Sequence, residues 1–130
     1  MRRSIPLLLL CAAVLACPSA QASEKKKSGG RDFLQLAPLA ATVLRSDGRR
    51  GVLTVEAGVD IRDEGLNALA QASMPRLRAA YVTVVQNHAQ GMGPGSPPNA
   101  DRLAADMQKA TDRVLGRPGA RVLLGTLMMN

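Results

Sequence analysis

The chain has 130 residues, a formal net charge of +7 and a hydrophobic fraction of 46%. With one Phe, one Tyr and no Trp, it has too few aromatic rings for a base-stacking surface, so we expect no nucleic-acid partner. A single histidine argues against a zinc centre, because zinc needs several protein ligands.

The first residues predict an export signal. Paired arginines at 2–3 form a basic start, residues 5–16 an apolar run, and residues 20–22, Ala-Gln-Ala, a small-x-small cleavage site. As a helix the apolar run would extend only about 18 Å, well short of the roughly 30 Å hydrocarbon core of a bilayer. We therefore predict a cleavable signal peptide over 1–22 and a periplasmic location. The Sec and twin-arginine routes both stay open, and lipidation at Cys17 is an alternative.

Cleavage at this site would leave residues 23–130 without cysteine, because both cysteines lie in the signal. This mature chain would carry fifteen basic and ten acidic residues, a net charge of +5. Lys25–Lys27 and the serine and glycines after them predict a basic flexible linker over 23–32. Such a linker promotes solubility or draws the protein weakly to an anionic membrane surface or cell-wall polymer. Residues 33–130 then form a single domain.

Two apolar runs at the start of this domain predict a β-hairpin. Residues 33–44 predict the first strand, in which Pro38 requires an edge position or a bulge because it has no N–H to donate. Residues 46–49, Ser-Asp-Gly-Arg, are typical of a tight turn. From Leu53 to Ile61 apolar and polar residues alternate, as in a strand with one buried face.

Helical spacing begins after Asp63, which is a predicted N-cap. An apolar stripe recurs at this spacing from residue 66 to residue 88. Pro75 lies inside the stripe and removes a backbone hydrogen bond, so we expect a kink or a break near residues 72–74.

The segment after residue 89 predicts a loop, a second helix and a last strand. Residues 90–98 are rich in Gly and Pro, and nothing in the sequence pins this loop to the domain. Asn99 or Asp101 caps the next helix, and Gly116 ends it. Residues 120–129 are apolar on both faces, which predicts a strand at the centre of the sheet.

These elements predict an α+β domain in the order ββααβ. A small mixed or antiparallel sheet, made of the hairpin and the C-terminal strand, would pack against two helices in a single layer, because each element must bury its apolar side.

Residues that could carry catalysis or bind a metal show no arrangement typical of a site. His88 lies near the end of the long helix, where we predict a packing or capping role with its cation favouring the helix dipole. Asp60, Asp63 and Glu64 gather where strand meets helix, and capping explains them better than a cation site. The glycines at 91–95 follow a helix rather than a strand, so we reject a phosphate loop. We predict a protein without catalytic residues, cofactors or metals.

Four arginines are the candidate interaction residues, because arginine is enriched at protein interfaces: Arg49, Arg50, Arg76 and Arg78. The alternative is that they belong to an ordinary solvated surface. The edge of the strand that contains Pro38 and the outer face of the helices are the predicted contact surfaces.

Several stretches together resemble the periplasmic domain of the FliL family of flagellar basal-body-associated proteins. They are FLQLAPLAATVL at 33–44, DGRRGVLTVE at 47–56, MPRLR at 74–78 and DRVLG at 112–116, with a short apolar strand ending on Asn130. The resemblance implies a stomatin/prohibitin-like fold, a tendency to form rings and a non-enzymatic role around the flagellar stator. Family members carry an N-terminal membrane helix, whereas this chain has a short signal in its place.

Two functions follow as hypotheses. The first is an exported structural or interaction protein that assembles with itself or with a membrane complex such as the flagellar basal body or stator. The alternative is a periplasmic binding or adaptor module of unrelated role, whose basic linker and arginines contact anionic membrane or cell-wall ligands.

Overall fold

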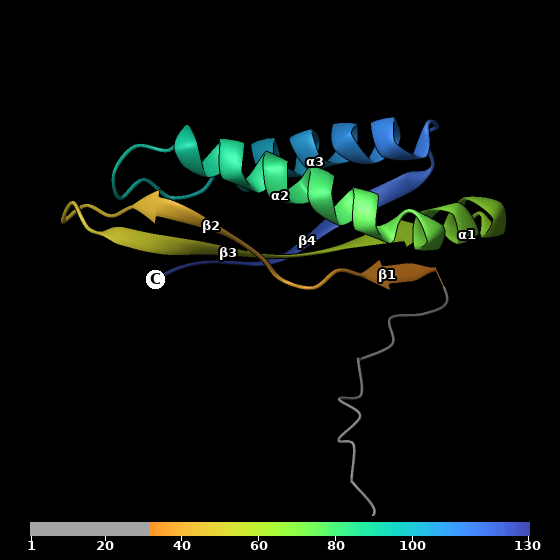
Figure 1. The fold of residues 1–130 in the computed structure, drawn as a ribbon, viewed down its shortest axis with the longest axis horizontal. Coiled ribbons are helices and arrows are strands. Elements are labelled where there is room, and N and C mark those ends of the chain that lie inside the picture. The colour runs from red at the N-terminus through yellow and green to blue at the C-terminus, as the bar shows by residue number, and fades with distance from the viewer. Residues whose placement is uncertain (1–31) are drawn as a thin grey trace, which may run out of the picture.

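The computed structural model describes residues 32–130 as a twisted sheet covered on one face by helices (Figure 1). The predicted signal peptide and all but the last residue of the predicted linker lie outside the described residues. The domain has the predicted α+β class. Its elements in chain order are β1 (Phe33–Gln35), β2 (Leu39–Leu44), β3 (Arg50–Ile61), α1 (Glu64–Ala72), α2 (Met74–Gln90), α3 (Ala100–Leu115) and β4 (Ala120–Met129).

The sheet is antiparallel throughout, and β3 is its central strand. β2 and β4 both pair with residues 53–55 of β3, and β1 and β4 both pair with residues 58–60. Since a strand has two edges, β1 and β2 must follow one another along one edge while β4 occupies the other. The prediction that residues 120–129 form the central strand is therefore wrong. Their apolar residues lie on an edge strand, with α3 packed near it.

The predicted strand over 33–44 is two strands with a break at residues 36–38. The Leu36 N–H still donates to the Ala57 carbonyl at 3.1 Å, so the chain stays beside β3 through the break. Pro38 has no N–H to donate and lies at the edge of the sheet, as predicted.

The long apolar stripe is divided between α1 and α2, with Ser73 between them. This confirms the break expected near residues 72–74. Pro75 lies in the first turn of α2, where its missing N–H has no helical partner to lose. Because both the first strand and the long helix are interrupted, the order is βββαααβ rather than the predicted ββααβ, and three helices rather than two form the layer.

Local capping follows the predictions closely. The Asp63 carboxylate accepts the Leu66 N–H at 2.6 Å, and its Oδ1 lies 3.3 Å from the Arg117 guanidinium. Asn99, and not Asp101, is the N-cap of α3, because its side chain accepts the Arg102 N–H at 2.9 Å. Gly116 follows α3 with φ +75°, a conformation that glycine adopts without strain.

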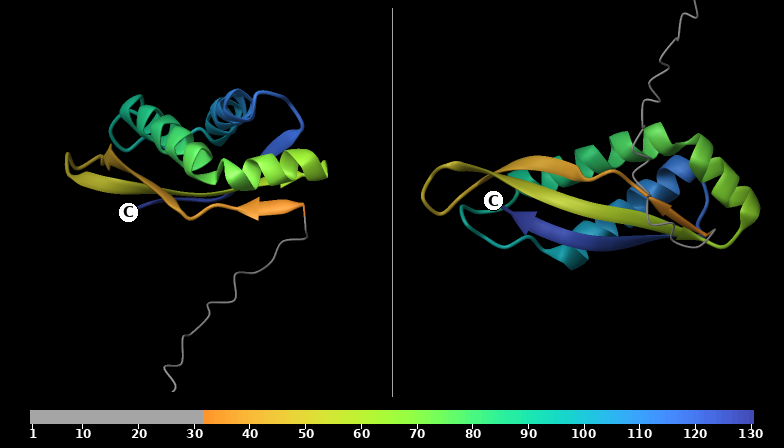
Figure 2. Two further views of the ribbon diagram at one scale, coloured as in Figure 1. Left: turned by 45° about the vertical axis from the view of Figure 1, so that its right-hand side comes forward. Right: turned by 90° about the horizontal axis from the view of Figure 1, so that it is seen from below.

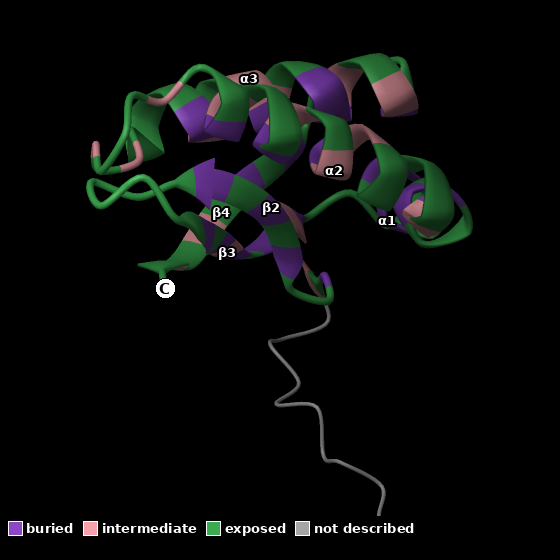
Figure 3. Cartoon of the chain, turned by 60° about the vertical axis from the view of Figure 1, so that its left-hand side comes forward, coloured by how far each residue is buried: buried purple, intermediate pink, exposed green. Residues whose placement is uncertain are grey.

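The core lies between the sheet and the helices (Figure 3). The alternating residues of β3 that were predicted to face inward are all buried, and β2 adds three more. α2 packs over β2 and α3 over β4, so the two long helices span the sheet side by side (Figure 2). The sheet residues of this core are Leu39, Ala41, Val43, Leu53, Val55, Ala57, Val59 and Ile61.

Tyr81 joins α2 to α3 inside this core. It is fully buried, and its hydroxyl lies 2.5 Å from Thr111 Oγ1. The Thr111 hydroxyl donates its proton to the Met107 carbonyl at 2.8 Å, so the Tyr81 hydroxyl is the donor in its bond with Thr111. Burial raises the pKa of Tyr81 above its ordinary value, and the negative charge of Asp112 raises it further.

We expect the domain to lose stability above about pH 10 because of Tyr81. In the unfolded chain the phenol ionises near its ordinary pKa, while the folded state holds the proton to higher pH. The folded state then binds more protons, so its stability falls as pH rises through this window. The free-energy difference between wild type and Tyr81→Phe should be constant below pH 9 and shrink above pH 10, by chemical denaturation. A difference that stays constant throughout the alkaline range would contradict this prediction.

Candidate functional site

The four candidate arginines do not form one cluster. Arg49 and Arg50 are exposed at the β2–β3 turn, and Arg76 and Arg78 are exposed in the first turns of α2. The C-terminal end of α2, not its start, leads to the loop that contacts this turn (Figure 1). A helix of 17 residues is about 25 Å long, so the two pairs lie far apart.

Arg78 has an internal partner. Its Nη1 donates to the carbonyl of Ala37 at 3.1 Å, in the break between β1 and β2. This bond ties α2 to the sheet edge and covers a backbone oxygen that an edge strand would otherwise present. Arg78 is therefore partly engaged in the fold, while nothing in the described residues assigns Arg76 a comparable contact.

All the helices lie on one side of the sheet, and the other face is uncovered (Figure 2). Residues of β3 with even numbers, and their cross-strand partners on β2 and β4, point to this open face because the odd-numbered ones point to the core. Several large apolar side chains lie exposed there. The most exposed are Leu44 (47%), Val52 (45%), Leu123 (38%) and Met128 (47%).

One end of the open face is partly covered by Phe33. Its ring lies over Gly58, where any side chain would collide with it, and Leu123 is the partner of Gly58 on β4. An aromatic ring on a strand glycine restores packing that the glycine lacks. The other end carries Val52 and Met128, both of which are more exposed than Leu123.

Gln108 of α3 closes part of the outer edge of β4. Its amide oxygen accepts the Val122 N–H at 2.9 Å, and its amide nitrogen donates to the Ala120 carbonyl at 2.7 Å. The side chain thus makes the two backbone contacts that a neighbouring strand would make. This blocks strand addition at the start of β4.

The loop after α2 is held in place, contrary to the prediction that nothing pins it. The Gly95 N–H donates to the Leu44 carbonyl at 3.0 Å, and Gly95 lies so close to Ser46 that a side chain would collide. At its other end His88 Nε2 accepts the Asn99 N–H at 3.3 Å. His88 is half-buried, and its hydrogen bond is to the N-cap residue of α3 rather than to the end of its own helix.

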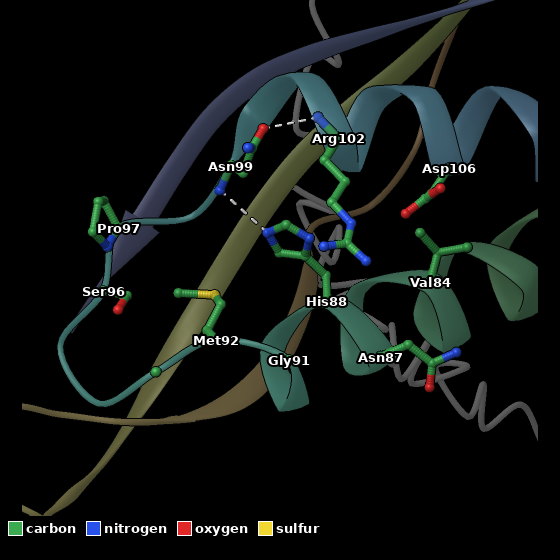
Figure 4. A pocket seen from close by; sticks show the side chains of 11 residues that line it. Val84, Asn87, His88, Gly91, Met92, Ser96, Pro97, Asn99, Arg102 and Asp106 are labelled. Carbon is green, nitrogen blue, oxygen red and sulfur yellow. Dashed lines mark hydrogen bonds between the residues drawn. The ribbon is translucent and has the colours of Figure 1, made fainter.

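This loop, α2 and α3 enclose a cleft of about 420 Å³ (Figure 4). Such a volume is in the range of small-molecule sites. Its polar groups come from facing turns of two helices, and its apolar groups come mainly from the loop. The lining residues that matter to its chemistry are Val84, Asn87, His88, Met92, Arg102 and Asp106.

Neither the open face nor the cleft was predicted from the sequence. Val52 and Met128 lie at outward-facing positions of β3 and β4. Such positions are usually polar in a half-buried strand, so the apolar residues there were the sequence signal for the open face. His88, Arg102 and Asp106 belong to two helices, and no sequence signal joins them.

Among residues 32–130, no group of acidic, cysteine and histidine side chains is placed to hold a metal ion. Nor does any helix in this range have the length and hydropathy to cross a membrane. No family model and no curated protein matches the chain.

Proposed function

We propose that this chain is an exported, non-enzymatic interaction protein, similar to the periplasmic domain of the FliL family, that binds a partner protein through the open face of its sheet. The observation that carries the proposal is the exposure of Leu44, Val52, Leu123 and Met128 on that face. A sheet with one solvated face is usually polar there, so exposed apolar residues gathered on it indicate a contact surface.

The surroundings of these residues fit a protein partner. Glu56, Asp60 and Arg121 occupy the same face, and Asp60 and Arg121 are cross-strand partners of opposite charge. An apolar centre with charged groups around it is the usual anatomy of a protein interface. Face-to-face packing with another sheet, including that of a second copy, would bury the apolar residues at once.

The flagellar part of the proposal rests on the resemblance of the strand, turn and helix stretches at 33–44, 47–56, 74–78 and 112–116. On this resemblance we propose a partner in the basal body or the stator.

The test replaces apolar residues of the open face by lysine. Val52→Lys and Met128→Lys should each weaken self-association or cross-linking to a basal-body protein by tenfold or more, about the effect of losing a buried anchor. Leu69→Lys is the matched control, because Leu69 is 41% exposed but lies on α1. In a deletion strain, swimming should be restored by wild type and Leu69→Lys but not by the two face variants.

Normal swimming of the deletion strain would overturn the flagellar assignment, and unchanged association of both face variants would overturn the role of the face. Circular dichroism must show that each variant is folded.

The alternative, binding of anionic membrane or cell-wall ligands, is favoured by exposed Arg49 and Arg50. It predicts binding to anionic vesicles that salt abolishes, because screening removes charge attraction but leaves apolar contact.

A further inference from the structure

We propose that the cleft between α2 and α3 binds a small amino-carboxylate, such as a free amino acid or a short peptide, with Arg102 holding the carboxylate and Asp106 the ammonium group. This site is separate from the open face of the sheet and does not depend on the proposed function. The helices and the loop, rather than the strands, supply its lining residues.

Arg102 supplies the anion-binding group. Its side chain reaches from α3 toward His88 in the cleft (Figure 4). Within residues 32–130 its guanidinium makes no hydrogen bond or ion pair; only its backbone N–H is engaged, by the Asn99 cap. A guanidinium offers a planar fork of donors that fits a carboxylate, so an unengaged one in a cleft is suited to that ligand group.

His88 adds a second donor beside Arg102. Its Nε2 accepts the Asn99 N–H, so in the neutral imidazole the proton is on Nδ1. Figure 4 shows this other ring nitrogen on the side of the Arg102 guanidinium. A carboxylate between the two groups would receive hydrogen bonds from both, while the bond to Asn99 fixes the ring orientation.

Asp106 supplies the opposite charge one helical turn further along α3. Residues four apart lie on the same face of a helix, yet Asp106 is not paired with Arg102; its ion pair is with Lys109 at 3.9 Å. Lys109 is 74% exposed and Asp106 is 42% exposed, so solvent screens the pair, which contributes little and leaves the carboxylate available. The cleft thus presents a positive and a negative side chain from one helix, which suits a ligand that carries both an ammonium and a carboxylate.

The rest of the lining limits the size of the ligand. Val84 and Met92 add apolar side chains to the lining, and Asn87 adds an amide from α2. The volume of about 420 Å³ holds an amino acid or a dipeptide rather than a polymer.

His88 makes the test direct, because it is the sole histidine and the NMR signals of its two carbon-bound ring protons overlap with those of no other imidazole. The protein should be titrated with alanyl-alanine, with N-acetyl-alanine, which lacks the ammonium, and with alaninamide, which lacks the carboxylate. We expect saturable shifts of the His88 signal and of the loop amides with alanyl-alanine at millimolar concentration, and weaker binding of both analogues.

Variants assign the two roles. Arg102→Gln should weaken alanyl-alanine about tenfold or more, the usual effect of losing a charged hydrogen bond. Asp106→Asn should weaken alanyl-alanine but not N-acetyl-alanine. Arg113→Gln, exposed on α3 outside the cleft, is the matched control and should bind like wild type. No saturable shift with alanyl-alanine up to about 50 mM, or equal binding by Arg102→Gln, would overturn the proposal.

Discussion

Tyr81→Ala should remove most of the stability of this domain. Tyr81 is fully buried between the two long helices and the sheet, and it is the largest such side chain. Deleting a buried aromatic ring costs about 3–5 kcal/mol, against a total of roughly 5–15 kcal/mol for a typical domain. Urea denaturation followed by circular dichroism would measure the loss in unfolding free energy.

Tyr81→Phe is the matched control, because it keeps the ring and removes only the hydroxyl. Thr111 Oγ1 retains its bond to the Met107 carbonyl, so no buried proton donor is left without an acceptor. The cost should be about 1 kcal/mol. If Tyr81→Phe were as destabilising as Tyr81→Ala, the hydrogen bond rather than the packing of the ring would be the main contribution.

Gln108→Ala should both destabilise the domain and open an edge of its sheet. The substitution leaves the Val122 N–H and the Ala120 carbonyl without their partner, at a cost of about 1–3 kcal/mol. It also uncovers backbone groups at the start of β4, which an edge strand of another molecule can then bind. Chemical denaturation measures the loss of stability. Sedimentation velocity at rising protein concentration measures self-association through the uncovered edge.

Hydrogen exchange at Val122 provides a residue-specific measurement. The amide is protected by Gln108 in the wild type and should exchange faster in the variant, while amides in the centre of β3 keep their relative order of protection. Gln86→Ala, at an exposed position on α2, is the control and should alter neither stability nor exchange. Unchanged exchange at Val122 would show that Gln108 does not protect the β4 edge.

Elements that are determined by neighbouring residues in the sequence were predicted well. The alternation from Leu53 to Ile61 became the buried face of β3, and the turn at 46–49 joins β2 to it. Asp63 and Gly116 cap their helices as expected. Each of these depends on residues within a few positions of one another, so the signal is present in the sequence itself.

Predictions that depended on neighbours in space were less successful. Apolar residues on both sides of 120–129 indicated a central strand, yet β4 is an edge strand with Leu123 and Met128 exposed. The pattern records that both faces are apolar, but it does not distinguish burial by helices from exposure on an open face. The loop at 90–98 likewise gained its anchor from Leu44, a residue far away in the chain.

By itself the sequence determined the α+β class, the hairpin, the break before Pro75 and the helix ends, because these arise from backbone chemistry and short-range periodicity. Only the tertiary structure decided which strand is central, that one sheet face stays open, and that Arg102 shares a cleft with His88. These features arise where segments distant in the chain pack together, and that packing is set by the shape and burial of the whole domain rather than by any local pattern.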